Sequence, residues 1–229
     1  MESGFKFRLR CEYTIDRPLD RLHIYCMKSQ FNKDGEVIGK VPSSINTTIS
    51  DFLEMCTYCI ASEQGENKSI DLASVGIRFG RETFDDRFFY CGDLQLTVGE
   101  VYIMYEILKR KISVNSLKMY KYTESYYIFL SREGYSFIAD KTLSCAGMFR
   151  ISEILKTNFT VSDRPTNGFV TYGKEVPLGV VQSAWLEKGA CHPYVNLRYR
   201  DMIMNPSLEE FNKLKTIITS IYSDFNFEI

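Results

Sequence analysis

The sequence offers one candidate nucleophile, the thiol of Cys145. This cysteine lies in Leu-Ser-Cys-Ala-Gly, at the start of a segment, 145–157, whose pattern predicts a helix. A helix N-terminus lowers the pKa of a thiol and favours the reactive thiolate. The base would have to be His23 or His192, since the chain has 2 histidines. A thiol-dependent hydrolase or transferase is therefore one alternative function, although the flanking residues match no thiol-protease signature.

Two further cysteines have the spacing of half a metal site. Cys56 and Cys59 form a C-x2-C pair, but a structural zinc site needs two more ligands and no second pair follows. Both fall on the apolar stripe of a predicted helix, where small buried side chains are expected. The 7 cysteines are an odd number in mostly apolar surroundings, which indicates reduced thiols. We expect no metal.

A glycine-containing segment resembles a nucleotide-binding loop in part. Residues 168–175 match G-x-x-x-x-G-K, but Glu175 stands where Ser or Thr would ligate magnesium. Pro177 follows and the next residues predict a strand, so no helix N-terminus would face a phosphate. We therefore expect no cofactor.

Nucleic-acid binding is a second alternative, through the segment Lys109–Lys121. Its cations lie near several tyrosines, and aromatic rings beside cations can stack bases and hold phosphates. However, Lys109–Lys111 end a predicted helix, where cations interact favourably with the helix dipole. The net charge of −1 gives no general attraction to nucleic acid. Nucleic acid is therefore not the expected partner.

The most distinctive surface candidate is a hairpin that contains aromatic and arginine side chains. Trp185 lies in its first predicted strand, and the second places Tyr194, Arg198 and Arg200 on one face, because their separations are even. Tryptophan, tyrosine and arginine are enriched at binding hot spots. We expect these residues to form a partner-binding face, the alternative being a buried Trp185 with solvated arginines.

Composition narrows the class of protein. The 229 residues are 45% hydrophobic and 14% aromatic, which excludes a disordered chain and allows a substantial core. No apolar run reaches the ~18 residues that a membrane-spanning helix needs. The first residues lack the apolar core of a signal peptide. We therefore expect a cytoplasmic protein that does not associate with membranes, and the sequence leaves self-association open.

The predicted strands occur mainly as hairpins. Asp34-Gly35 and Gly134 supply the left-handed positions that tight turns require. Strands are expected over 5–13, 21–31, 36–41, 73–80, 87–91, 117–130, 135–140, 179–187 and 192–201.

Helices are expected between the groups of hairpins. Capping boxes at Thr97–Glu100 and Ser207–Glu210 predict the start of two of them. The order predicts an α+β fold, with a mainly antiparallel sheet built from three hairpins and three or four helices packed on it. We expect a single domain, 1–229, the alternative being two closely packed lobes, 1–112 and 113–229. The helices are expected over 50–62, 97–111, 145–157 and from Ser207 to about 223.

These observations favour a non-catalytic protein that binds another macromolecule, with a protein as the expected partner. Immunity proteins, inhibitors and adaptors are of this kind and act by steric occlusion. The scarcity of histidine and the missing metal and cofactor motifs support this interpretation, and the tyrosine-rich composition suits an interface.

Overall fold

The chain forms two compact units of mixed helix and strand. One comprises Met1–Leu117 with Thr142–Ser144, and the other comprises Lys118–Lys141 with Cys145–Ile229. Both contain antiparallel strands and helices, so the predicted α+β class is confirmed, although the strands pair into more hairpins than three. The computed structural model describes residues 4–61, 69–72, 77–82, 85–92, 94–144, 146–156, 170–171, 183–185, 194–195, 197–199, 202–204 and 206–223.

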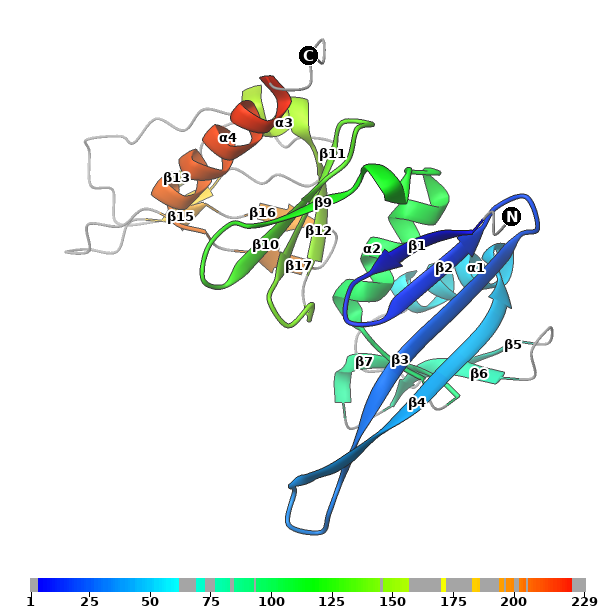
Figure 1. Ribbon diagram of the computed structural model, residues 1–229. Coiled ribbons are helices and arrows are strands. Elements are labelled where there is room, and N and C mark those ends of the chain that lie inside the picture. The colour runs from blue at the N-terminus through cyan, green and yellow to red at the C-terminus, as the bar shows by residue number, and fades with distance from the viewer. Residues whose placement is uncertain are drawn as a thin grey trace. The chain divides into compact units, whose positions relative to one another are not determined.

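A four-stranded antiparallel meander begins the first unit (Figure 1). Its strands are β1 (Phe5–Arg8), β2 (Glu12–Asp16), β3 (Arg21–Phe31) and β4 (Val37–Thr48). The predicted hairpin around Asp34-Gly35 is confirmed, and Gly35 has a φ of 82°. One face of the sheet joins the core through alternate apolar side chains, Tyr13, Ile15, Leu22, Ile24 and Ile45.

The single strand expected over 5–13 is wrong, because the chain reverses at residues 9–11. Phe5 lies opposite Ile15 and Arg8 lies opposite Glu12, so the segment contains one strand, the reversal and the start of the next strand. A distant side chain holds this reversal, since the Glu100 carboxylate accepts hydrogen bonds from Arg10 and from the Cys11 N–H. The alternation of apolar residues over 5–13 is a local pattern, so it cannot indicate the contact with Glu100.

Two helices and a second sheet complete the first unit. The helices α1 (Ile49–Ala61) and α2 (Val98–Lys109) confirm two predictions, and the predicted Thr97–Glu100 capping box is present. All residues from Val98 to Leu108 are buried, so α2 has no solvated face. A 3-10 turn, Val114–Ser116, follows α2. The second sheet has the order β5 (Ser69–Leu72), β6 (Ile77–Glu82), β7 (Asp85–Cys91) and β8 (Leu94–Thr97).

The second unit begins with another antiparallel meander. Its strands are β9 (Lys118–Lys121), β10 (Tyr126–Leu130), β11 (Tyr135–Asp140) and β12 (Ala146–Arg150). The strand expected over 117–130 is divided by a turn in which the Thr123 hydroxyl accepts hydrogen bonds from the N–H groups of Ser125 and Tyr126. Gly134 has a φ of 81°, as the predicted turn requires.

The helix expected over 145–157 is mostly wrong. Ala146–Arg150 form strand β12, and the helix α3 is short, Ile151–Lys156. The side chains from Ala146 to Phe149 are all buried and their backbone pairs with β11. Burial on both faces of a strand removes the alternation that would distinguish it from a helix, which explains the error.

The last helix, α4 (Leu208–Ser223), confirms its prediction. The Ser207 hydroxyl accepts from the Glu210 N–H, and the Glu210 carboxylate accepts from the Ser207 N–H, so the predicted capping box is present. Its apolar stripe is buried at Phe211, Leu214, Ile218 and Tyr222.

Short strands make up the rest of the described chain. Strand β14 pairs with β15, as the predicted hairpin over 179–201 requires. However, β15 and β16 belong to different sheets, so the single strand expected over 192–201 is wrong. Strand β16 pairs with β17 and also contacts β12. The bounds are β13 (Val170–Thr171), β14 (Ser183–Trp185), β15 (Tyr194–Val195), β16 (Leu197–Tyr199) and β17 (Met202–Met204).

Candidate functional site

The outer part of the β3–β4 hairpin, residues 26–43, which we call the arm, has no buried residue. Strand β2 pairs with β3 from Arg21 to Tyr25, and beyond Tyr25 the ladder continues between β3 and β4. Figure 1 shows this ribbon extending well past β1 and β2. A two-stranded ribbon is marginally stable in water on its own, so a projecting one of this length suggests a role outside the core.

The arm exposes large apolar side chains. Phe31 lies opposite Val37 and Met27 lies opposite Pro42, so these side chains meet in pairs across the ribbon. Single apolar side chains are ordinary on a surface, whereas a group of neighbours marks an interaction site. Their exposed fractions lie between 41% and 66%, and the group comprises Met27, Phe31, Val37, Ile38 and, on the opposite face of the ribbon from Met27, Val41.

Asn32 organises the tip of the arm. Its side-chain oxygen accepts hydrogen bonds from the N–H of Asp34 at 2.9 Å and of Glu36 at 2.8 Å. Its side-chain nitrogen donates to the Glu36 carboxylate at 2.9 Å. These local bonds give the turn a defined geometry, so the neighbouring Phe31 and Val37 are presented in a fixed register.

Pro42 limits how another strand could pair with the arm. Strand β4 lies at the edge of its sheet. Proline has no N–H, and it is accommodated in an edge strand where that position faces away from the neighbouring strand. The outer edge of β4 therefore lacks a donor at Pro42, and Lys40 adds a charge that discourages edge pairing. The side chains of the arm, rather than its edge, are thus the better binding surface.

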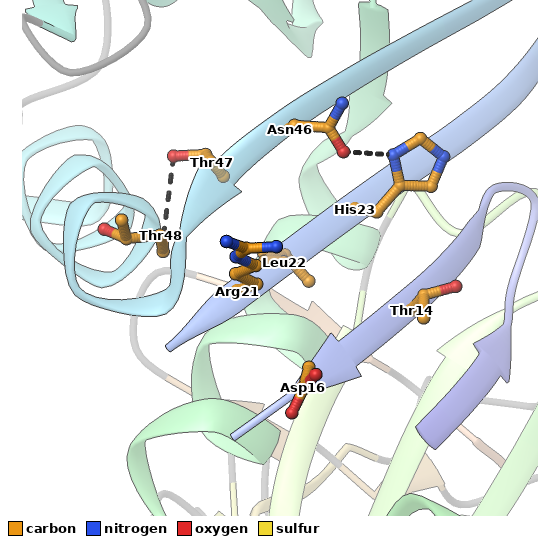
Figure 2. A pocket seen from close by; sticks show the side chains of 8 residues that line it. All are labelled: Thr14, Asp16, Arg21, Leu22, His23, Asn46, Thr47 and Thr48. Atoms are coloured by element: carbon orange, nitrogen blue, oxygen red, sulfur yellow. Dashed lines mark hydrogen bonds between the residues drawn. The ribbon is translucent and has the colours of Figure 1, made fainter. Parts of the chain in front are cut away.

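A pocket of about 530 Å³, lined mostly by residues with polar side chains, lies at the foot of the arm. Figure 2 shows the His23 ring and the Asn46 amide pointing toward one another, with His23 Nδ1 2.6 Å from Asn46 Oδ1. The ladder places Thr14 opposite His23. Such a surface can hold a small polar ligand, but no cysteine is among the described residues that line it: Thr14, Asp16, Arg21, Leu22, His23, Asn46, Thr47 and Thr48.

The candidate nucleophile and its second candidate base, Cys145 and His192, lie outside the described residues. The segment that follows Cys145 is strand β12, so the expected helix N-terminus that would activate the thiol is not there. Another thiol, that of Cys91, is kept protonated and therefore less reactive, because desolvation raises its pKa to about 12. The hypothesis of a thiol-dependent enzyme therefore lacks the helix N-terminus that was expected to lower the pKa of Cys145.

The predicted partner-binding hairpin is described only in its backbone. Trp185 lies directly opposite Tyr194, which places the two in one strand pair. Arg198 lies in β16, in a different sheet, so Tyr194 and Arg198 do not share one continuous strand as expected. Arg200 and the side chains of the other three lie outside the described part, and the binding face they would form stays a prediction.

Three cations in the segment Lys109–Lys121 have intramolecular partners that bear on nucleic-acid binding: Lys109, Arg110 and Lys121. Lys109 Nζ donates to the Tyr105 hydroxyl at 2.8 Å, and Arg110 Nε lies 2.8 Å from the Glu106 carboxylate. Lys121 Nζ lies 2.6 Å from Glu124, an ion pair that raises the pKa of the lysine. These contacts offer no support for nucleic-acid binding through the segment.

The hairpin that forms the arm is predictable from the sequence, but its role as a candidate binding surface was not among the predictions. A signal was present, because Phe31, Val37 and Ile38 flank a polar turn where solvated residues are usual. Across the residues that the structure describes, no group of three or more His, Cys, Asp or Glu side chains is placed to hold a metal ion. No helix in those same ranges is long and apolar enough to cross a membrane.

Comparison with known proteins found no match to this chain among protein-family models, curated proteins or solved structures.

Proposed function

We propose that this chain is a non-catalytic protein-binding protein of the immunity, inhibitor or adaptor type, and that the arm is its binding surface. The observation that carries the proposal is the exposed apolar group Met27, Phe31, Val37, Ile38 and Val41 on a projecting ribbon. Leaving these side chains in water is unfavourable, and burying them against a partner would recover about 25 cal/mol per Å² of apolar area.

The expected partner is a protein with an apolar groove or active-site cleft that accepts the ribbon. A two-stranded ribbon is narrow, and its paired apolar side chains can fill such a cleft and exclude other ligands by steric occlusion. The arm carries Lys28, Lys33 and Lys40 against Asp34 and Glu36, so its charges are nearly balanced and add little to the attraction of a partner. We place this activity in the cytoplasm, since Cys11, Cys26 and Cys91 are free thiols.

Site-specific photo-cross-linking tests the proposal. A photoreactive residue replaces Ile38 in one sample and Leu19 in another, and both are expressed in the native host. Leu19 is a matched control, because it belongs to the same unit and is 58% exposed against 66% for Ile38, but lies outside the arm. We expect a cross-linked protein from position 38 and none from position 19.

Direct titration then measures the contribution of the arm. Hot-spot side chains contribute about 2 kcal/mol or more, so Phe31→Ser and Ile38→Ser should each raise the Kd for the captured protein about 30-fold. Leu19→Ser should leave it unchanged. If Tyr194→Ala or Arg198→Ala lowers the affinity instead, the binding site lies on the hairpin predicted over 179–201. If position 38 cross-links only to a second copy of this chain, the arm mediates self-association and the proposed partner is wrong.

A further inference from the structure

Cys11 and Cys26 face each other at the root of the arm. The β2–β3 ladder ends with Glu12 opposite Tyr25, and the next step in the same register places Cys11 opposite Cys26. Cys26 is also among the neighbouring groups that raise the pKa of the Cys11 thiol, which agrees with this placement. Both are free cysteines. Two cysteines opposed across neighbouring strands meet the first requirement for a disulfide.

The backbone geometry suits that bond. The Cys11 N–H donates to Glu100 Oε1 at 3.1 Å, and the Cys11 carbonyl accepts from the Leu9 N–H at 3.0 Å. Because both main-chain groups of Cys11 are bonded outside the ladder, Cys11 and Cys26 are opposed as a non-hydrogen-bonded pair. Cα atoms in such pairs lie about 4.5 Å apart, inside the range of roughly 4.4–6.8 Å that disulfides span.

We infer that Cys11 and Cys26 form a redox-sensitive dithiol, which a small disulfide such as glutathione disulfide converts to a cross-strand disulfide at the root of the arm. The inference does not depend on the proposed function. Cytosolic disulfides are usually transient and redox-sensing, which agrees with the expected compartment.

The reaction proceeds by two thiol–disulfide exchanges. Cys26, which is partly exposed, attacks one sulfur of glutathione disulfide, and the leaving glutathione takes up the proton that Cys26 released. Cys11, after losing its own proton, attacks the Cys26 sulfur of the mixed disulfide and releases the second glutathione. The two protein thiols are oxidised by two electrons, and the glutathione disulfide is reduced to two glutathione molecules.

The environment of Cys11 determines the rate. Burial and the nearby Glu100 carboxylate raise the pKa of the Cys11 thiol, which lowers its thiolate fraction. The second exchange is therefore expected to be the slow one, with a detectable mixed disulfide on Cys26 before the bond closes. Once closed, the disulfide ties the first residue of the arm to the residue that precedes β2.

Peptide mapping of the full folded chain tests the inference. The protein is incubated in glutathione buffers of increasing disulfide fraction, quenched with N-ethylmaleimide and digested with trypsin. Cys11 and Cys26 fall in separate tryptic peptides, 11–21 and 22–28, each with no other cysteine. We expect these two peptides to become joined by a disulfide, with the loss of two hydrogens. Cys91 is a buried cysteine elsewhere in the unit, so the control variant Cys91→Ser should not change the yield of the joined peptide.

Two variants keep the result interpretable. Cys11→Ser should stop at a persistent glutathione adduct on Cys26, and Cys26→Ser, at a partly exposed position that tolerates change, should abolish the joined peptide. The inference is overturned if wild-type peptides 11–21 and 22–28 stay separate in folded protein. It is equally overturned if the adduct on Cys26 never resolves, or if the bond forms between other cysteines.

Discussion

The Arg10 guanidinium lies against the buried Glu100 carboxylate, with Arg10 Nη2 3.3 Å from Glu100 Oε2. Glu100 is fully buried, whereas the Arg10 side chain is partly exposed. The same carboxylate accepts hydrogen bonds from the N–H of Cys11 at 3.1 Å and of Thr97 at 2.9 Å. One side chain therefore joins the β1–β2 connection to the first turn of α2, over about 90 residues of chain.

Replacing this carboxylate should destabilise the first unit. In Glu100→Gln the amide offers one acceptor oxygen, so its NH2 group must face the N–H of Cys11 or of Thr97. A buried donor without an acceptor costs about 1–3 kcal/mol, which urea unfolding would measure. Glu100→Ala, which removes both acceptors, should cost more, about 3–5 kcal/mol. A wild-type urea midpoint for both variants would show that the contact does not stabilise the fold.

Two buried tyrosines in the second unit should respond differently to loss of the hydroxyl. Tyr222 donates to the Ser131 carbonyl, so Tyr222→Phe should cost about 1–3 kcal/mol. The Tyr122 hydroxyl is buried with no hydrogen-bond partner in the described structure, so Tyr122→Phe should be neutral or stabilising. Thermal unfolding of the two variants checks the contrast. Equal losses would mean that the Tyr122 hydroxyl is bonded in solution.

Two glycines in the arm should also differ. Gly35 has a φ of 82°, where a Cβ atom is strained, so Gly35→Ala should weaken the turn by about 1–2 kcal/mol. Gly39 has an ordinary strand conformation, and a Cβ there would meet Gln30 Oε1 at 3.7 Å, so Gly39→Ala should be tolerated. Amide hydrogen exchange at Glu36, whose N–H bonds to Asn32, reports the turn. Similar exchange in both variants would contradict the assigned geometry.

Alkaline pH should lower stability through the buried Cys91 thiol. Its pKa is raised from 9.0 to about 12, so above pH 9 the unfolded state loses this proton while the folded state retains it. The stabilisation is complete below about pH 9 and is lost as pH rises toward 12, by about 1.4 kcal/mol per pH unit. Cys91→Ala should reduce the slope of unfolding free energy against pH in this window. An unchanged slope would show that Cys91 is not the group responsible.

The sequence was a better guide to the elements than to the site. The capping boxes at Thr97 and Ser207 and the turn at Gly35 were predictable, because each depends on bonds or torsions within a few residues. His23 was selected as a base, and the structure places it on a polar sheet face hydrogen-bonded to Asn46. The exposure of the arm is not predictable from its own residues, because it depends on β2 covering β3 only from Arg21 to Tyr25.

The sequence by itself determined the class of fold, the position of the β3–β4 turn and the starts of α2 and α4. These features follow from local hydrogen bonds and backbone preferences, which act within one or two turns of chain. Tertiary structure decided that residues 5–13 reverse direction, since Glu100 supplies the bonds, and that 146–150 join a sheet through β11. It also decided that Phe31 and Ile38 stay exposed, because burial depends on residues distant in sequence.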